Sequence, residues 1–247
     1  MTVLVIDVGN TRIKWGFHHQ GEWLSLGALP RPDALRLASL WADQPLPTRV
    51  LACNVSDGYA RQEIESAVHA RGAQVEWVRS QARQCGVVSG YDDPMQLGAD
   101  RWLGMVAARK RTSATSRACL IMSVGTAVTI DALSAWGKHL GGIILPNPAL
   151  MADALERHTA GLKRQPGKVV MLPTNTSDAI ATGAIVALAG ALARVEGVLK
   201  AEEDNGCELL VTGGGGADLR PHLHRPSLLV PNLVLEGLVV VADEVAQ

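Results

Sequence analysis

The sequence lacks an excess of charge of either sign. It has 23 lysine and arginine residues against 24 aspartate and glutamate residues, which leaves a formal net charge of -1. A protein that binds nucleic acid through the phosphate backbone needs a basic face, and this balance does not supply one. We therefore expect a neutral, soluble protein that makes no direct contact with nucleic acid.

Cysteines and long apolar runs are also scarce. The 4 cysteines are too few for a disulfide framework and lack metal-ligand spacing, so we expect buried, reduced thiols. The apolar segment 183–192 is too short to cross a bilayer, which predicts a buried helix and no membrane contact. The first residues have no basic region, and Asp7 interrupts their apolar run. They therefore predict a strand, not a signal peptide, and a cytoplasmic location.

The sequence does contain enough apolar residues for a full core, and it contains one strand pattern twice. Of its 247 residues 47% are hydrophobic, so one large or two modest domains can form. Apolar runs at 3–6 and 13–17 flank a polar turn that contains Gly9 and Thr11. A similar arrangement recurs over 120–133, again with a glycine and a threonine at the turn. Both segments predict two strands joined by a glycine-bearing turn.

Helices and strands are predicted to alternate along the intervening chain. The spacing of apolar residues predicts helices at 30–42, 58–71 and 101–110 and strands at 50–54 and 75–78. The polar segment 111–117 has no apolar periodicity, which predicts a boundary. We therefore predict an α/β fold of two similar halves, residues 1–115 and 116–247, with a ligand cleft between them.

The first glycine-bearing turn has the residue types of a phosphate site. Gly9 lets an oxygen approach the backbone because it has no Cβ. Lys14 can direct a positive charge toward the turn, and Asp7 can hold Mg²⁺ or its waters. A plain hairpin turn explains one such segment better. Two matched glycine–threonine turns in one chain favour phosphate binding.

A third polar segment spans Gly98 to Arg101. An acid beside an arginine at a loop–helix junction fits an N-cap with a surface ion pair. It also fits a general base, Asp100, that accepts the proton of an attacking hydroxyl while Arg101 binds an anionic group. The segment by itself does not separate these two interpretations.

Two further glycine-rich segments adjoin predicted strands. Four glycines at 213–216 directly follow the strand at 210–212, where they form either a flexible loop or a close approach to a flat ligand such as adenine. Gly141 and Gly142 open another strand, and tight packing explains them as well as ligand binding does. Together with the phosphate turns and the candidate base, these segments predict transfer of the γ-phosphoryl group of ATP to a small hydroxylated substrate.

The order of these motifs resembles the type III pantothenate kinases. The resemblance rests on Asp7-x-Gly9-Asn10-Thr11-x-x-Lys14, Tyr91, Gly98-x-Asp100-Arg101, Gly125-Thr126-Ala127-x-Thr129-x-Asp131 and Gly141-Gly142-x-Ile144-x-Pro146. It implies two ribonuclease-H-like halves of the acetate-and-sugar-kinase, Hsp70 and actin superfamily around a nucleotide cleft. It also implies a homodimer that phosphorylates pantothenate with ATP, the first step towards coenzyme A.

The resemblance further implies roles for individual residues, with Asp100 as the catalytic base. The implied ATP-binding residues are Asp7, Val8, Gly9, Asn10, Thr11, Arg12, Ile13, Lys14 and Thr126. The implied substrate-binding residues are Tyr91, Gly98, Ala99, Asp100, Arg101 and Thr176. Thr176 would come from the dimer partner or the facing half, and Thr174 is the alternative to it. Asp7 would hold Mg²⁺ through water.

Two positions depart from the family pattern. Ser123 stands where the family usually has an aspartate that binds a monovalent cation, K⁺ or NH₄⁺, so the charge attraction for that cation is lost. Asn147 stands where a glycine is usual. Ser123 keeps a second hypothesis open: a catalytically weak nucleotide-binding relative that acts as an accessory factor for transcription. A sugar or acetate kinase is the third, and the chain is short for those families.

Overall fold

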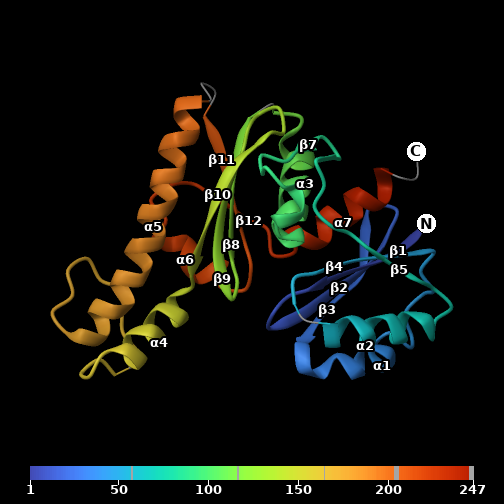
Figure 1. Ribbon diagram of the computed structural model, residues 1–247, viewed down its shortest axis with the longest axis horizontal. Coiled ribbons are helices and arrows are strands. Elements are labelled where there is room, and N and C mark those ends of the chain that lie inside the picture. Colours follow the sequence, from blue (N-terminus) through green and yellow to red (C-terminus); the bar gives the residue numbers. More distant parts are fainter. Residues whose placement is uncertain (57, 116, 164, 203–205, 245–247) are drawn as a thin grey trace. The chain divides into compact units, whose positions relative to one another are not determined.

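The computed structural model (Figure 1) describes residues 1–247 apart from 57, 116, 164, 203–205 and 245–247. Its contacts divide the chain into two compact units. The first unit contains Met1–Ala114, Gly137–His139 and the chain from Asn232 onward, and the second contains Thr115–Trp136 and Leu140–Pro231. Relative to the division expected after residue 115, the C-terminal helix therefore groups with the first unit.

A five-stranded sheet forms the centre of the first unit, with the strand order β3-β2-β1-β4-β5. β1 and β2 are antiparallel, as are β2 and β3, whereas β4 runs parallel to β1 and β5 parallel to β4. The strands are β1 (Thr2–Val8), β2 (Arg12–His19), β3 (Glu22–Pro30), β4 (Arg49–Asn54) and β5 (Val75–Trp77). The two strands predicted to flank the first turn are β1 and β2, and β3 was not predicted.

Helices cover both faces of this sheet. On one face, η1 (Arg31–Arg36), α1 (Leu37–Leu40) and α2 (Gly58–His69) pack on the alternate residues of the strands and form a core cluster. On the other face lie α7 (Leu233–Glu244), which contacts β1, β2 and β4, and α3 (Ala99–Thr112), which packs along α7. Gly237 of α7 lies against the backbone of Leu103 in α3, where a Cβ would overlap the carbonyl group. The two helices can be this close only because residue 237 has no side chain.

A short irregular stretch follows β5 in the first unit. It contains the hairpin β6 (Arg83–Gln84) and β7 (Val87–Val88) and the turn η2 (Pro94–Gln96). The segment Gly137–His139 docks on this stretch, because Val88 N–H donates to the carbonyl oxygen of Gly137 (2.9 Å). This part of the first unit precedes α3 and carries Tyr91.

The second unit repeats the arrangement of the first, with the strand order β10-β9-β8-β11-β12. β8 and β9 are antiparallel, and β11 runs parallel to both β8 and β12. The elements are β8 (Ala118–Val124), β9 (Ala127–Leu133), β10 (His139–Pro146), α4 (Pro148–His158), α5 (Thr176–Glu202), β11 (Cys207–Thr212), α6 (Gly216–Leu219), η3 (Arg220–His222) and β12 (Leu228–Leu229). Since each sheet begins with a glycine-bearing turn between its first two strands, the duplication inferred from the sequence is present in the topology.

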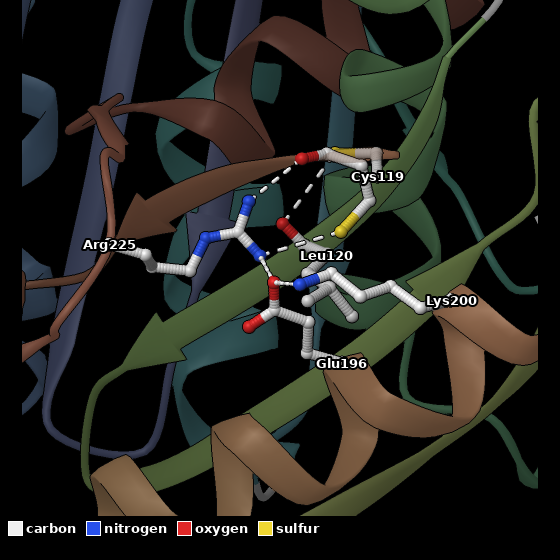
Figure 2. A network of polar contacts seen from close by, with 6 residues as sticks. Cys119, Leu120, Glu196, Lys200 and Arg225 are labelled. Carbon is white, nitrogen blue, oxygen red and sulfur yellow. Dashed lines mark hydrogen bonds and ion pairs between the residues drawn. The ribbon is translucent and has the colours of Figure 1, made fainter. Parts of the chain in front are cut away.

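A polar network ties the loop before β12 to the rest of the second unit (Figure 2). The guanidinium group of Arg225 donates to the carbonyl oxygen of Cys207 (2.7 Å) and pairs with Glu196 of α5 (2.7 Å). Glu196 also pairs with Lys200 one turn later (2.8 Å). Because Arg225 and Glu196 are both largely buried, the network holds β11, α5 and this loop together.

Two predicted helices differ from the observed ones. The segment 30–42 was predicted as a helix, but it is a 3₁₀ turn followed by one short α-helical turn. Its buried residues Ala34, Leu37 and Trp41 have the spacing of one helix face, which is why the sequence pattern predicted a single longer helix.

The helix predicted over 183–192 extends over all of α5, and the expectation that it would be buried was wrong. Only 22% of its most apolar window is buried. By length and composition alone α5 could cross a membrane. That is weak evidence, because the core helix of a soluble protein passes the same test.

Candidate active site

The turn between β1 and β2 brings a carboxylate and an ammonium group together. Asp7 and Lys14 lie directly opposite each other on the two strands. The N–H of Gly9 donates to the carbonyl oxygen of Arg12 (3.0 Å), and a Cβ on Gly9 would lie 3.1 Å from that oxygen. The turn is therefore tight, and the exposed residues at its tip are Asn10, Thr11 and Arg12. Of the predicted ATP-binding set, only Thr126 belongs to the other unit.

Asp7 is held in an environment that disfavours its charge. Burial raises the pKa of Asp7 to about 6, the positive charge of Lys14 opposes this rise, and the negative charge of Asp100 adds to it. The thiol of Cys53, the partner of Asp7 on β4, donates to the carboxylate (3.6 Å). Burial also raises the pKa of the Cys53 thiol. Cys53 therefore acts as a neutral donor to Asp7.

Asp100 lies in the first turn of α3, close enough to Asp7 to affect its pKa. Its carboxylate accepts a hydrogen bond from the N–H of Arg101 (2.8 Å). A Cβ on Gly98 would lie 2.7 Å from the same carboxylate, so a larger residue there would displace it. The structure thus brings the predicted base and the predicted magnesium-binding carboxylate together within the first unit, although they are far apart in the sequence.

Tyr91 and Arg101 form a second polar group beside Asp100. The guanidinium group of Arg101 donates to the hydroxyl oxygen of Tyr91 (2.8 Å) and lies 5.6 Å from the centre of its ring. The ring of Tyr91 stacks on the buried imidazole of His139, with centroids 5.7 Å apart. Gly90 lies so close to the carbonyl group of His139 that a Cβ would overlap it. These contacts place a phenol and a guanidinium group, both able to bind a polar substrate, next to the candidate base.

The second glycine-bearing turn, between β8 and β9, lies against the glycine-rich loop. Gly213 has a positive φ of 86° and packs on the backbone of Val124, where a Cβ would overlap it. The N–H of Gly215 donates to the carbonyl oxygen of Val124 (3.0 Å). The glycines at 213–216 therefore have a packing role, since they let the loop reach the turn that carries Thr126.

Thr174 and Thr176 line one cavity in the second unit. The cavity has a volume of about 600 Å³, and its other lining residues include Leu155, Leu162 and Ile180. Thr176 is the first residue of α5. Since both threonines line the same cavity, the structure leaves the choice between them open.

The residues present fit Mg²⁺ better than they fit a monovalent cation. Asp7 suits Mg²⁺ because its carboxylate is only partly exposed and has a raised pKa, and a nearby cation would stabilise the ionised form. The position expected to bind a monovalent cation does not fit one well. Ser123 faces Thr129 across the β8–β9 pair, which places two neutral hydroxyl groups there. Among the described residues no group of three or more histidine, cysteine, aspartate or glutamate side chains could hold a metal ion.

Sequence reasoning missed three residues that contact the candidate site. Cys53 and His139 gave no signal, because a buried thiol and a single histidine are ordinary core residues. Asn147 was noticed only as a departure from a glycine. In the structure it caps α4 and donates from its side chain to the carbonyl oxygen of Gly125 (3.0 Å).

Comparisons with known proteins bear on the family and on the fold. The chain is similar to the type III pantothenate kinase of Paracidovorax citrulli (strain AAC00-1), with 42% identity over 99% of each chain. Among solved structures, it is similar to a Baf family protein from Campylobacter jejuni, with a TM-score of 0.60, 19% identity and 98% of each chain covered. A further likeness is to the inorganic polyphosphate/ATP-glucomannokinase of Arthrobacter sp. strain KM, with a TM-score of 0.51, 19% identity, and 99% of this chain and 98% of that chain covered.

These two structural likenesses show the fold alone, and they confirm the prediction of a sugar-kinase-like α/β fold built from two ribonuclease-H-like halves. The family itself is shown by the sequence. The sequence profile of the family described as type III pantothenate kinase matches residues 3–198. This range includes both glycine-bearing turns, Asp100 and Thr176. The chain belongs to the type III pantothenate kinase family.

Proposed function

We propose that this protein transfers the γ-phosphoryl group of ATP to the 4′-hydroxyl group of pantothenate, the first step towards coenzyme A. The observation that carries the proposal is the proximity of Asp100 to Asp7 in the first unit, together with Lys14 opposite Asp7. A phosphoryl transfer site needs a base for the attacking hydroxyl and groups that neutralise the phosphates. Both are present beside one tight glycine-bearing turn.

In this mechanism the first turn binds the phosphates of ATP. Lys14 supplies a positive charge, and the backbone from Asp7 to Lys14 supplies N–H groups around Gly9. Thr126 binds ATP from the second turn. Mg²⁺, held through water by Asp7, would neutralise phosphate charge when bound. Positioning and charge neutralisation supply most of the catalysis in this class of reaction.

Asp100 accepts the proton of the attacking hydroxyl. Its carboxylate accepts a hydrogen bond from the N–H of Arg101, which holds it at the start of α3 where a base is needed. Arg101 and Tyr91 then bind the polar end of pantothenate, whose carboxylate suits a guanidinium group. Gly98 and Ala99, directly before Asp100, belong to the same substrate-binding segment. Thr176, or Thr174, which lines the same cavity, supplies a further contact with pantothenate in this proposal.

The neutral second turn favours weak dependence on monovalent cations. A carboxylate attracts K⁺ or NH₄⁺ through its charge, which the hydroxyl group of Ser123 cannot do. We therefore propose that the enzyme works nearly as well in sodium salts as in potassium or ammonium salts.

The exposed apolar surface of the second unit supports a homodimer, which we place in the cytoplasm as for a soluble metabolic enzyme. In α5, Val186 is 61% exposed and Val198 is 47% exposed. Met171 and Leu172, in the segment before α5, are 94% and 83% exposed. A monomeric soluble protein rarely leaves this much apolar surface in water, and a second copy would cover it.

ADP production tests the proposed function. The protein is incubated with ATP, Mg²⁺ and pantothenate in parallel sodium, potassium and ammonium salts, and ADP is measured. We expect turnover that requires pantothenate and differs little between the salts. Strong activation by potassium would contradict the interpretation of Ser123. Tight ATP binding without turnover in any salt, from folded protein, would replace the kinase with the regulatory relative.

A further inference from the structure

Asn147 links the start of α4 to the second glycine-bearing turn. Its side-chain oxygen accepts a hydrogen bond from the N–H of Leu150 (2.8 Å), which is an N-cap. Its side-chain N–H₂ group donates to the carbonyl oxygen of Gly125 (3.0 Å). The two ends of one amide are therefore used for two purposes: one holds the helix and the other holds the turn.

The turn itself is held by hydrogen bonds from several directions. The carbonyl oxygen of Val124 accepts from the N–H of Gly215 (3.0 Å), and the N–H of Gly125 donates to the carbonyl oxygen of Ala127 (2.9 Å). The contact from Asn147 adds a restraint on the next peptide group, between Gly125 and Thr126. Each restraint removes freedom from a segment that glycine would otherwise leave mobile.

The planarity of the peptide bond makes this last restraint directional. In a trans peptide the carbonyl group and the following N–H point in opposite directions. When Asn147 holds the carbonyl of Gly125 toward α4, the N–H of Thr126 must point away from α4. The direction of one backbone donor in the turn is thus set by a side chain 21 positions later in the sequence.

We propose that Asn147 is a positioning residue for ATP binding. It orients the peptide between Gly125 and Thr126 so that this turn can donate to a phosphate oxygen. The inference rests on the proposed function, because it takes the turn to be a phosphate site. It adds to that function a residue that need not touch the nucleotide and acts through the backbone.

Two substitutions separate the cap from the contact with the turn. Asn147→Ser keeps a good N-cap oxygen but is too short to reach Gly125. Asn147→Asp also keeps the cap, but it places a carboxylate oxygen against the carbonyl of Gly125. Thr159→Ala is the matched control, because it removes a side-chain hydrogen bond to Leu155 (2.7 Å) at the other end of α4. All three variants are compared with the wild type by thermal unfolding, which should show similar stabilities for the two cap-preserving variants.

The readout is binding of ATP and of adenosine by calorimetry, together with the KM values for ATP and pantothenate. We expect Asn147→Ser to weaken ATP binding about 2- to 12-fold, the range for one hydrogen bond, and to leave adenosine binding unchanged. Asn147→Asp should weaken ATP binding further, and Thr159→Ala should leave both affinities unchanged. The KM for pantothenate should not change in any variant.

The outcomes distinguish this inference from the proposed function. If the wild type binds ATP and turns over, but Asn147→Ser binds ATP equally well, the positioning role is wrong and the kinase stands. Equal weakening of ATP and adenosine binding would also overturn it, because the effect would then not depend on phosphate. If the wild type binds ATP but never uses pantothenate, the proposed function fails while the comparison of variants still tests Asn147.

Discussion

Asp7→Asn should stabilise the protein while it abolishes phosphoryl transfer. Burial raises the pKa of Asp7 from an ordinary value of 3.8 to about 6. At neutral pH the folded protein therefore holds a carboxylate that would be ionised more easily in the unfolded chain. A pKa difference of this size corresponds to about 3 kcal/mol, at about 1.4 kcal/mol for each tenfold change in ionisation. Because Asp7 is partly exposed and asparagine loses the attraction of Lys14, we expect a gain of about 1–2 kcal/mol.

The pH dependence identifies the cause of this gain. Below pH 3.8 the carboxyl group is protonated in both states and does not affect stability. As the pH rises towards 6, the unfolded chain loses the proton first, so the wild type loses stability with rising pH. The advantage of Asp7→Asn should therefore grow between about pH 4 and 6 and stay level above that.

Thermal unfolding in the presence of a chelator measures the effect without Mg²⁺. We expect Asp7→Asn to unfold roughly 2–8 °C above the wild type at pH 7.5, with a smaller difference at pH 5. Asp43→Asn, which removes an exposed carboxylate from the same unit, should change little. Addition of Mg²⁺ should stabilise the wild type more than the variant. A variant less stable than the wild type at pH 7.5, or an advantage equal at pH 5 and pH 8, would refute the reasoning.

Three further predictions concern the base, the helix contact and the dimer. Asp100→Asn should lower kcat about 10²- to 10⁴-fold with little change in KM, and an unchanged kcat in folded protein would remove Asp100 from the role of base. Gly237→Ala should lower the free energy of unfolding by about 1–3 kcal/mol in urea titration, because its methyl group meets the Leu103 carbonyl; equal stability would show that the helices separate easily. Val186→Glu should shift the protein to monomer in sedimentation, whereas Tyr59→Glu, an exposed position of the first unit, should not. A monomeric wild type would exclude the dimer.

Much of the fold could be predicted because the strands on either side of each turn have clear apolar patterns. β1, β2, β8 and β9 lie where alternation and the glycine–threonine turns predicted them. β3 was missed because Gly27 interrupts its pattern. In the structure the ring of Trp15 on β2 covers Gly27 and leaves no room for a Cβ, so this glycine belongs to the strand for a reason set by its neighbour.

The candidate site was predictable in its residues but not in all its contacts. Asp7, Lys14 and Asp100 have side chains whose chemistry suggests a role wherever they lie. The contacts of Cys53 and His139 depend on which strands become neighbours, and that is decided by tertiary packing. Asn147 could not be placed for the same reason, since its partner Gly125 is brought close by the pairing of β8, β9 and β10.

Under the proposed function, the two turns would bind ATP phosphate through different kinds of group. The first turn has charged groups, Asp7 and Lys14, whose effects depend on pH and on Mg²⁺. The second has neutral groups around Ser123 and Thr126, so it can bind an anion only through oriented peptide and hydroxyl dipoles. A dipole attracts phosphate only when it points toward it, which makes orientation by Asn147 more important in a turn without charge. Substitutions in the first turn should therefore change pH and Mg²⁺ dependence, whereas those in the second should weaken ATP binding equally at every pH.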